Sequence, residues 1–286
     1  MTSSRAAVVR TGSHRISVTT FGSGEPAVVV EPAFGGNAAS WRDVAETLAD
    51  ETAVVTYDRA AYGSSSRALD NRTPGDIARD LHEVLDAADI PRPVVLVGHS
   101  AGGVHARAFT GLYDTEVAGM VLVDSSTEGQ AQILRDCLPW RDRFFEAVTL
   151  PFLMTVSRGI RSGADRRSMM REHRALKRLT VADQPLPPGA LGDRPLVVLT
   201  RGPGRGGTVS EDWRCWHDLN ADLALLSANS RHVIAHRAGH YIHHDDPGIV
   251  VAAIQDVVHS VRTGNRLDPV ASAYGPTRQE PDEHAG

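Results

Sequence analysis

The chain has 286 residues, of which 41% are hydrophobic, and its formal net charge is −5. Such a chain can bury a full hydrophobic core, although its length alone would allow two domains. The acidic charge balance gives no reason to propose nucleic-acid binding, and no apolar run approaches the roughly 18 residues that a membrane span requires.

The compartment is predicted from the cysteines and from the first residues. Cys137 and Cys215 show neither metal-ligand spacing nor a dense disulfide framework, which favours a reducing compartment. The apolar-tending stretch between Arg5 and Arg10 is too short for the core of a signal peptide. We therefore expect a cytoplasmic protein.

Short valine-rich runs alternate with segments of helical spacing along most of the chain. An opening hairpin is expected over residues 6–9 and 16–21. Further strands are expected at residues 28–30, 53–57, 94–97, 120–123, 196–199 and 232–235, and helices at 41–48, 77–85, 104–112, 213–226 and 247–258. Apolar runs of this kind are typical of a parallel sheet covered by helices on both faces. The proline-containing tail at residues 265–286 is expected to be disordered.

The sequence Gly-His-Ser-Ala-Gly at residues 98–102 directly follows one of these strands and precedes a helix. This arrangement is typical of a nucleophile elbow, a sharp turn that holds a serine hydroxyl above the end of a sheet. Gly98 and Gly102 supply the clearance that such a turn needs, because it brings the helix close to the strand. We therefore interpret Ser100 as a nucleophile.

A serine nucleophile needs a base that removes its proton, and a histidine is the usual choice. His240 follows Gly239 in the loop after the last expected strand, which favours it over the other histidines of the chain. We interpret His243 as a surface or pocket-rim residue and His99 as a packing or helix-face residue.

From about Arg5 to Gly264 the chain resembles the α/β-hydrolase family. The resemblance rests on the segments Gly-His-Ser-Ala-Gly-Gly at 98–103, Tyr-Asp-Arg-Ala-Ala-Tyr-Gly-Ser at 57–64 and Gly-His-Tyr at 239–241. It implies an α/β fold with a mostly parallel central sheet flanked by helices. It also implies a helical lid inserted after the sixth strand, so that residues 1–125 and 195–264 form the core and residues 126–194 form the lid.

In this family the acid of the triad lies between the nucleophile and the histidine in the chain. Many members carry it in the loop after the strand expected at residues 196–199, but here that loop has no carboxylate before residue 211. We therefore expect Asp124, at the end of the preceding strand, to accept a hydrogen bond from Nδ1 of His240. Asp212 and Asp218 are alternatives, and Asp124 could instead cap its strand.

The resemblance also implies two backbone donors for an oxyanion. Ala101 supplies one, and Phe34, in the loop after residues 27–30, aligns with the other. Pro32 and Ala33 replace the His-Gly or Ala-Gly of other members, and alanine adopts a positive φ less readily than glycine. Glu31 either orients this loop or is a solvated strand-end carboxylate.

The expected lid is rich in large apolar side chains and in basic ones. The apolar side chains either line a substrate pocket or pack the interior of the lid. The pocket candidates are Trp140, Phe144, Phe145, Met154 and Met169, together with Tyr241 outside the lid. Residues 135–178 hold 11 Lys and Arg against 5 Asp and Glu, a basic excess that either attracts anionic substrates or is simply solvated.

These residues predict a serine hydrolase that acts on a carboxylic ester through an acyl-enzyme. The alternatives are a thioesterase, a lactone-forming or lactone-opening enzyme or an acyltransferase and, more distantly, a lyase, a small-molecule receptor or a non-catalytic binding module. No metal and no organic cofactor is expected. The expected partner is a small acyl substrate, with no nucleic acid, and the sequence does not predict the oligomeric state.

Overall fold

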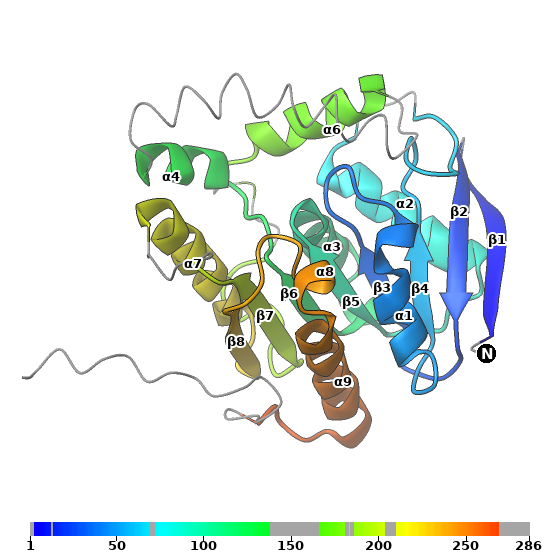
Figure 1. Ribbon diagram of the computed structural model, residues 1–286. Helices are drawn as coiled ribbons and strands as arrows, with labels where there is room; N and C mark the ends of the chain where they lie inside the picture. Colours follow the sequence, from blue (N-terminus) through cyan, green and yellow to red (C-terminus); the bar gives the residue numbers. More distant parts are fainter. Residues whose placement is uncertain are drawn as a thin grey trace, which may run out of the picture.

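The computed structural model describes residues 3–12, 14–68, 72–137, 166–180, 183, 186–203 and 210–268. Within these residues, eight strands form one sheet in the order β1-β2-β4-β3-β5-β6-β7-β8 (Figure 1). The strands are β1 (Ser4–Thr11), β2 (His14–Phe21), β3 (Val28–Glu31), β4 (Val54–Tyr57), β5 (Val94–His99), β6 (Val117–Val123), β7 (Leu196–Arg201) and β8 (Ser230–Ala235). Strand β2 is antiparallel to both of its neighbours, and the other pairs are parallel.

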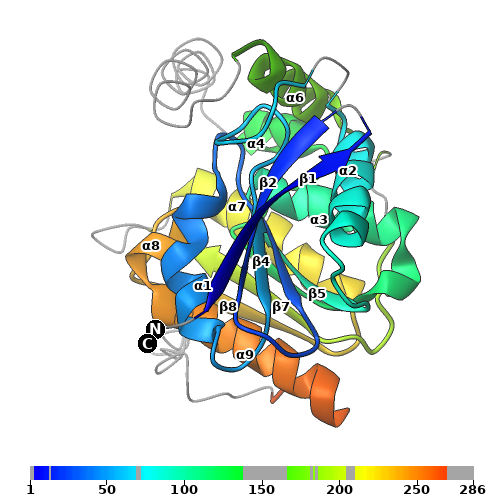
Figure 2. The same ribbon diagram turned by 90° about the vertical axis from the view of Figure 1, so that its right-hand side faces the viewer.

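Helices cover both faces of this sheet (Figure 2). One face packs against α1 (Arg42–Leu48) and α9 (Pro247–Thr263), and the other against α2 (Pro74–Ala87), α3 (Ala101–Leu112) and α7 (Glu211–Leu223). Shorter elements are η1 (Ala38–Trp41), η2 (Asp114–Glu116), η4 (Ala224–Leu226) and α8 (Ile242–Asp245). This architecture is the fold predicted from the sequence.

The central strands are apolar on both sides because both sides are buried. Val29 and Leu96 pack in the cluster that contains α2 and α3, whereas their neighbours Val28 and Val95 pack in the cluster that contains α1 and α9. All four are at most 1% exposed. The two-residue alternation of the strands thus builds two cores, one on each face of the sheet.

Two helices of the expected lid segment are described, α4 (Gln130–Cys137) and α6 (Arg166–Arg178). They lie above the sheet in Figure 1. The segment follows β6, as expected, but its action as a lid is a prediction that the fold alone does not test. Four pocket candidates lie outside the described residues: Trp140, Phe144, Phe145 and Met154.

The tail prediction is wrong for residues 265–268. Leu267 is 9% exposed within the core cluster of α9, and its N–H donates to Asn229 Oδ1 at 2.9 Å. Arg231 donates to the carbonyl of Asp268 at 2.8 Å. The apolar side chain and these two hydrogen bonds hold the chain past Asn265, and the rest of the predicted tail lies outside the described residues.

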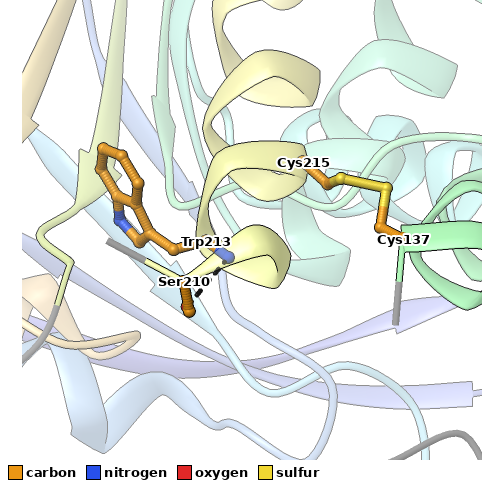
Figure 3. The surroundings of a disulfide bond; sticks show 4 residues. All are labelled: Cys137, Ser210, Trp213 and Cys215. Carbon is orange, nitrogen blue, oxygen red and sulfur yellow. Dashed lines mark hydrogen bonds between the residues drawn. A yellow bond between two sulfur atoms is a disulfide. The ribbon is translucent and has the colours of Figure 1, made fainter. Parts of the chain in front are cut away.

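A disulfide joins Cys137 at the end of α4 to Cys215 in α7, across 78 residues of sequence (Figure 3). This disulfide weighs against the interpretation of the two cysteines as a sign of a reducing compartment, because disulfides persist mainly in oxidising compartments. The bond ties the expected lid segment to a core helix. Among the described residues, no helix combines the length and the apolar character needed to cross a membrane.

Removing the disulfide should lower stability, because the cross-link restricts the unfolded chain. The double variant Cys137→Ser/Cys215→Ser should lose about 2–4 kcal/mol of unfolding free energy, as is typical for such bonds. Urea unfolding with and without reductant measures the loss, and the double variant should not respond to reductant. An unchanged midpoint for the wild-type protein under reducing conditions would show that the bond contributes nothing.

Candidate active site

Ser100 lies at a strained turn between β5 and α3. Its φ is +54° and its ψ is −121°, a conformation that non-glycine residues rarely adopt and that marks functional sites. A Cβ on Gly98 would lie 2.6 Å from the Cα of Gly103, and one on Gly102 would overlap the carbonyl of Glu31. The two glycines therefore provide the clearance predicted from the sequence.

The backbone of Ser100 is held from both sides. Its N–H donates to the carbonyl of Val123, the last residue of β6, at 3.1 Å, and its carbonyl accepts from the N–H of Gly103 and of Ser126, each at 3.0 Å. These contacts fix the serine above the carboxyl ends of β5 and β6.

The structure brings together His240 and Asp124, which are 116 residues apart. Nδ1 of His240 lies 2.6 Å from Oδ2 of Asp124. A carboxylate can only accept a hydrogen bond, so Nδ1 carries a proton, and in the neutral ring Nε2 then presents a lone pair. The imidazole is thereby set in the tautomer that a general base needs.

Asp124 is fully buried and accepts four hydrogen bonds. Its Oδ1 accepts from the backbone N–H of Arg201 at 3.0 Å and from the indole of Trp216 at 2.7 Å. Its Oδ2 accepts from Arg201 Nη1 at 2.9 Å and from His240. Burial acts to raise the pKa of Asp124, but the bond from His240 and the charge of Arg201 outweigh it, so the pKa lies below its usual 3.8. The group is an ionised carboxylate.

Sequence reasoning missed Arg201 and Trp216. The guanidinium of Arg201 lies 4.5 Å from the ring centre of Trp216, and α7, capped by Ser210 (Figure 3), carries Trp216 on its buried side. One signal was present in the sequence: the loop that lacks the expected acid begins with an arginine. The guanidinium of Arg201 pairs with Asp124, the carboxylate that takes the place of the acid expected in that loop.

Three contacts hold the loop that carries His240. Nε2 of His99 lies 2.8 Å from the carbonyl of His240, so it is the donor. The N–H of Gly239 donates to Asp245 Oδ2 at 2.8 Å, and the N–H of Gly202 donates to the carbonyl of Ala238 at 3.0 Å. His99 is the packing residue expected, and its ring also positions the histidine loop.

The interpretation of His243 as a surface or pocket-rim residue is wrong. Its ring is buried and stacks on Trp41 with ring centres 4.3 Å apart. Burial, with the neighbouring histidines, lowers the pKa of His243 to about 2, so it stays neutral. It therefore belongs to the packing beneath the histidine loop.

The alternative acids lie elsewhere. Asp212 and Asp218 are exposed on α7, and Asp218 contacts His217 at 3.1 Å. Neither forms a hydrogen bond with His240 among the described contacts, whereas Asp124 does. Asp124 is thus the carboxylate that the structure places on the imidazole.

The loop expected to carry the second oxyanion donor follows β3. Its positive φ falls on Gly35, at +75°, and not on Ala33, so the replacement of glycine by Ala33 strains nothing. Arg59 holds the loop by donating to the carbonyls of Pro32 at 2.7 Å and Ala33 at 3.0 Å. Ala101 is the first residue of α3 and directly follows Ser100. Phe34 lies in the turn that also contains Gly35.

Glu31 is not a solvated carboxylate. It is fully buried, accepts a hydrogen bond from the Tyr57 hydroxyl, and lies 3.5 Å from Arg59 Nη1. The alternative in which it orients the loop is consistent with this position, because Arg59 contacts both Glu31 and the loop carbonyls.

Two pocket candidates are described. Met169 is 1% exposed on α6, and half-buried Tyr241 packs against His99 and His240 with ring centres 5.6 and 5.3 Å apart. Their contact with a substrate stays a prediction. Within the described ranges no group of three or more His, Cys, Asp or Glu side chains could hold a metal ion.

Assigning the acid to Asp124 or to Asp212 predicts different effects of mutation. Asp124→Asn should lower kcat for an ester about 10⁴-fold, because the amide favours the wrong tautomer of His240. Asp212→Asn, the matched control on α7, should change kcat less than about twofold, since its side chain is exposed. Steady-state kinetics on both variants decides, and the reverse order of effects would move the acid to α7.

Comparison with known proteins places this chain in a family. A model described as the alpha/beta hydrolase fold matches residues 26–171. The protein YqjL of Bacillus subtilis, named as uncharacterized, is 28% identical over 236 residues, which cover 82% of this chain and 85% of that protein.

Solved structures give the same result for the fold alone, since their identities are low. A thermophilic esterase from Thermogutta terrifontis has a TM-score of 0.66 at 20% identity, over 91% of this chain and 100% of that one. An esterase from Exiguobacterium antarcticum has a TM-score of 0.67 at 16% identity, over 88% and 98%. Because the family model covers half of the chain, this protein belongs to the α/β-hydrolase family.

Proposed function

We propose that the protein is a serine hydrolase that cleaves a carboxylic ester through an acyl-enzyme intermediate. The observation that carries the proposal is the 2.6 Å contact between His240 Nδ1 and the buried, ionised Asp124. Asp124 follows β6, and Ser100 occupies a strained elbow at the carboxyl end of the neighbouring strand β5. A purely structural aspartate could be satisfied by Arg201 and Trp216 alone and would need no histidine from a loop 116 residues away.

The proposed reaction uses groups of this chain only. Ser100 Oγ attacks the ester carbonyl while Nε2 of His240 takes its proton, and Asp124 stabilises the imidazolium. The N–H groups of Ala101 and Phe34 stabilise the oxyanion of the tetrahedral intermediate. Collapse expels the alcohol, which takes the proton from His240 and leaves an acylated Ser100.

The second half repeats these roles with water as the nucleophile. His240 removes a proton from water as it attacks the acyl carbonyl, and then returns the proton to Ser100 Oγ as the carboxylic acid leaves. No step of this proposal draws on a metal or an organic cofactor. The partner is a small acyl substrate.

Thioester cleavage, lactone chemistry and acyl transfer share the acyl-enzyme with this proposal. They differ from it in the leaving group and in the nucleophile that accepts the acyl group. A cytoplasmic location belongs to the same proposal, but the disulfide between Cys137 and Cys215 weighs against it, because thiols are kept reduced in the cytosol.

The test is a substrate panel with a nucleophile variant. Purified protein should hydrolyse p-nitrophenyl esters faster than matched acyl thioesters, and Ser100 should be labelled by a fluorophosphonate. Ser100→Ala should abolish labelling and lower kcat by about 10⁶-fold, because Oγ alone forms the acyl-enzyme.

The control is Ser126→Ala, which removes a nearby hydroxyl but leaves the nucleophile. A folded Ser100→Ala protein that keeps more than a few per cent of activity would end the assignment. Preference for thioesters, or product formation that depends on an added alcohol, would redirect the proposal to thioesterase or acyltransferase. A wild-type protein that binds ligands without turnover would make it a receptor.

A further inference from the structure

Helix α6 contacts the loop of the second oxyanion donor through a buried guanidinium. Arg59 is 2% exposed, and its two terminal nitrogens donate to the carbonyls of Pro32 at 2.7 Å and Ala33 at 3.0 Å. These are the two residues that precede Phe34. A planar guanidinium that holds two successive carbonyls fixes both the position and the direction of the peptide that follows.

The same guanidinium is held from α6. Arg59 Nη2 donates to Glu172 Oε1 at 3.0 Å, and the hydroxyl of Tyr62 donates to Glu172 Oε2 at 2.8 Å. The side chains of Arg59 and Glu172 are each 1% exposed. Nη2 thus bridges the carbonyl of Ala33 and the carboxylate of Glu172, so a movement of α6 acts on the loop through one nitrogen.

The pair is charged on both sides. Burial acts to raise the pKa of Glu172, but the charge of Arg59 and the hydrogen bond from Tyr62 outweigh it, so the pKa lies below its usual 4.5. A buried ion pair is a poor source of stability, because apolar side chains of similar volume often serve as well. Its geometry is therefore the property to explain.

The next residue of α6, His173, contacts Phe34, the residue expected to supply the second oxyanion donor. The ring of His173 packs against that of Phe34, with centres 5.4 Å apart and an angle of 42° between the planes. Glu172 and His173 therefore hold the loop at two points, one through Arg59 and one directly.

We infer that Arg59 and Glu172 are positioning residues. Through them, the oxyanion hole is formed only when α6 is packed in place against the loop of Phe34. When α6 is packed in place, Glu172 holds the guanidinium of Arg59, and Arg59 holds the loop that carries the N–H of Phe34. When Glu172 is withdrawn, Arg59 keeps only Glu31 as an ionic partner among the described residues, on its other terminal nitrogen, and the second donor loses its fixed position. This inference rests on the proposed function, because it assigns the pair to the oxyanion hole of that reaction.

Three variants separate positioning from stability. Glu172→Gln keeps the shape but removes the charge. Arg59→Met/Glu172→Met, combined with Glu31→Gln because buried Glu31 also lies 3.5 Å from Arg59, removes all three charges of the cluster and should restore stability, but leaves the carbonyls of Pro32 and Ala33 unheld. Asp256→Asn is the control, because it breaks the buried Arg231 pair on β8 and α9, far from the loop in the sequence and on other elements.

The readouts are kcat, KM, urea unfolding and the inhibition constant of an alkylboronic acid. A boronic acid adds to the serine as a tetrahedral anion whose oxygen occupies the oxyanion hole, so its affinity reports the donors directly. Glu172→Gln should lower kcat about ten- to a hundredfold with KM within about threefold, and weaken the boronic acid by the same factor as kcat/KM. The triple variant should regain stability but not kcat, and Asp256→Asn should lose stability only.

Two results would overturn the inference. One is a Glu172→Gln protein with unchanged kcat and boronic acid affinity. The other is a triple variant that regains activity together with stability, which would make the ion pair purely structural. If wild-type protein neither hydrolyses an ester nor binds the boronic acid through Ser100, the proposed function fails, and the inference fails with it.

Discussion

A buried, ionised carboxylate must have its hydrogen bonds satisfied by the protein, and in this fold that constraint falls on Asp124. Its side chain has no solvent contact and accepts four hydrogen bonds, from Arg201, Trp216 and His240. An unpaired buried charge would cost several kcal/mol. The ends of β6 and β7, helix α7 and the loop after β8 must therefore meet at one place, and that place holds the imidazole of His240.

Ser100 follows β5, which lies between β3 and β6 in the sheet. On the β6 side the buried charge of Asp124 orients His240. On the β3 side the buried charges of Arg59 and Glu172 hold the loop of Phe34. In both groups, the packing of strands and helices sets where the hydrogen-bond donors and acceptors lie. Because the charged side chains are buried, those positions are costly to change.

The parts of this site that were predictable have local signals. Valine runs predict buried strands, and glycines on either side of Ser100 predict a close approach of α3, because both effects act between neighbours in the chain. Asp124 was predicted by elimination, since the later loop holds no carboxylate near its start. His240 followed from its place after the last strand.

The missed parts are pairings between distant segments. Arg201 lies 77 residues and Trp216 lies 92 residues from Asp124, and Arg59 lies 113 residues from Glu172. No periodicity or local propensity records such contacts, and the same holds for the disulfide between Cys137 and Cys215. Leu267 shows the opposite error, because a polar, proline-containing composition concealed one apolar anchor.

The central claim is that Asp124 fixes the proton of His240 on Nδ1, and nitrogen-15 NMR of the histidine side chains tests it most directly. The His240 signals, assigned by their change in an Asp124→Asn protein, should show Nδ1 protonated and Nε2 unprotonated in the neutral wild-type enzyme, with the Nδ1 proton far downfield and protected from exchange. A neutral His240 that carries its proton on Nε2 would contradict the account.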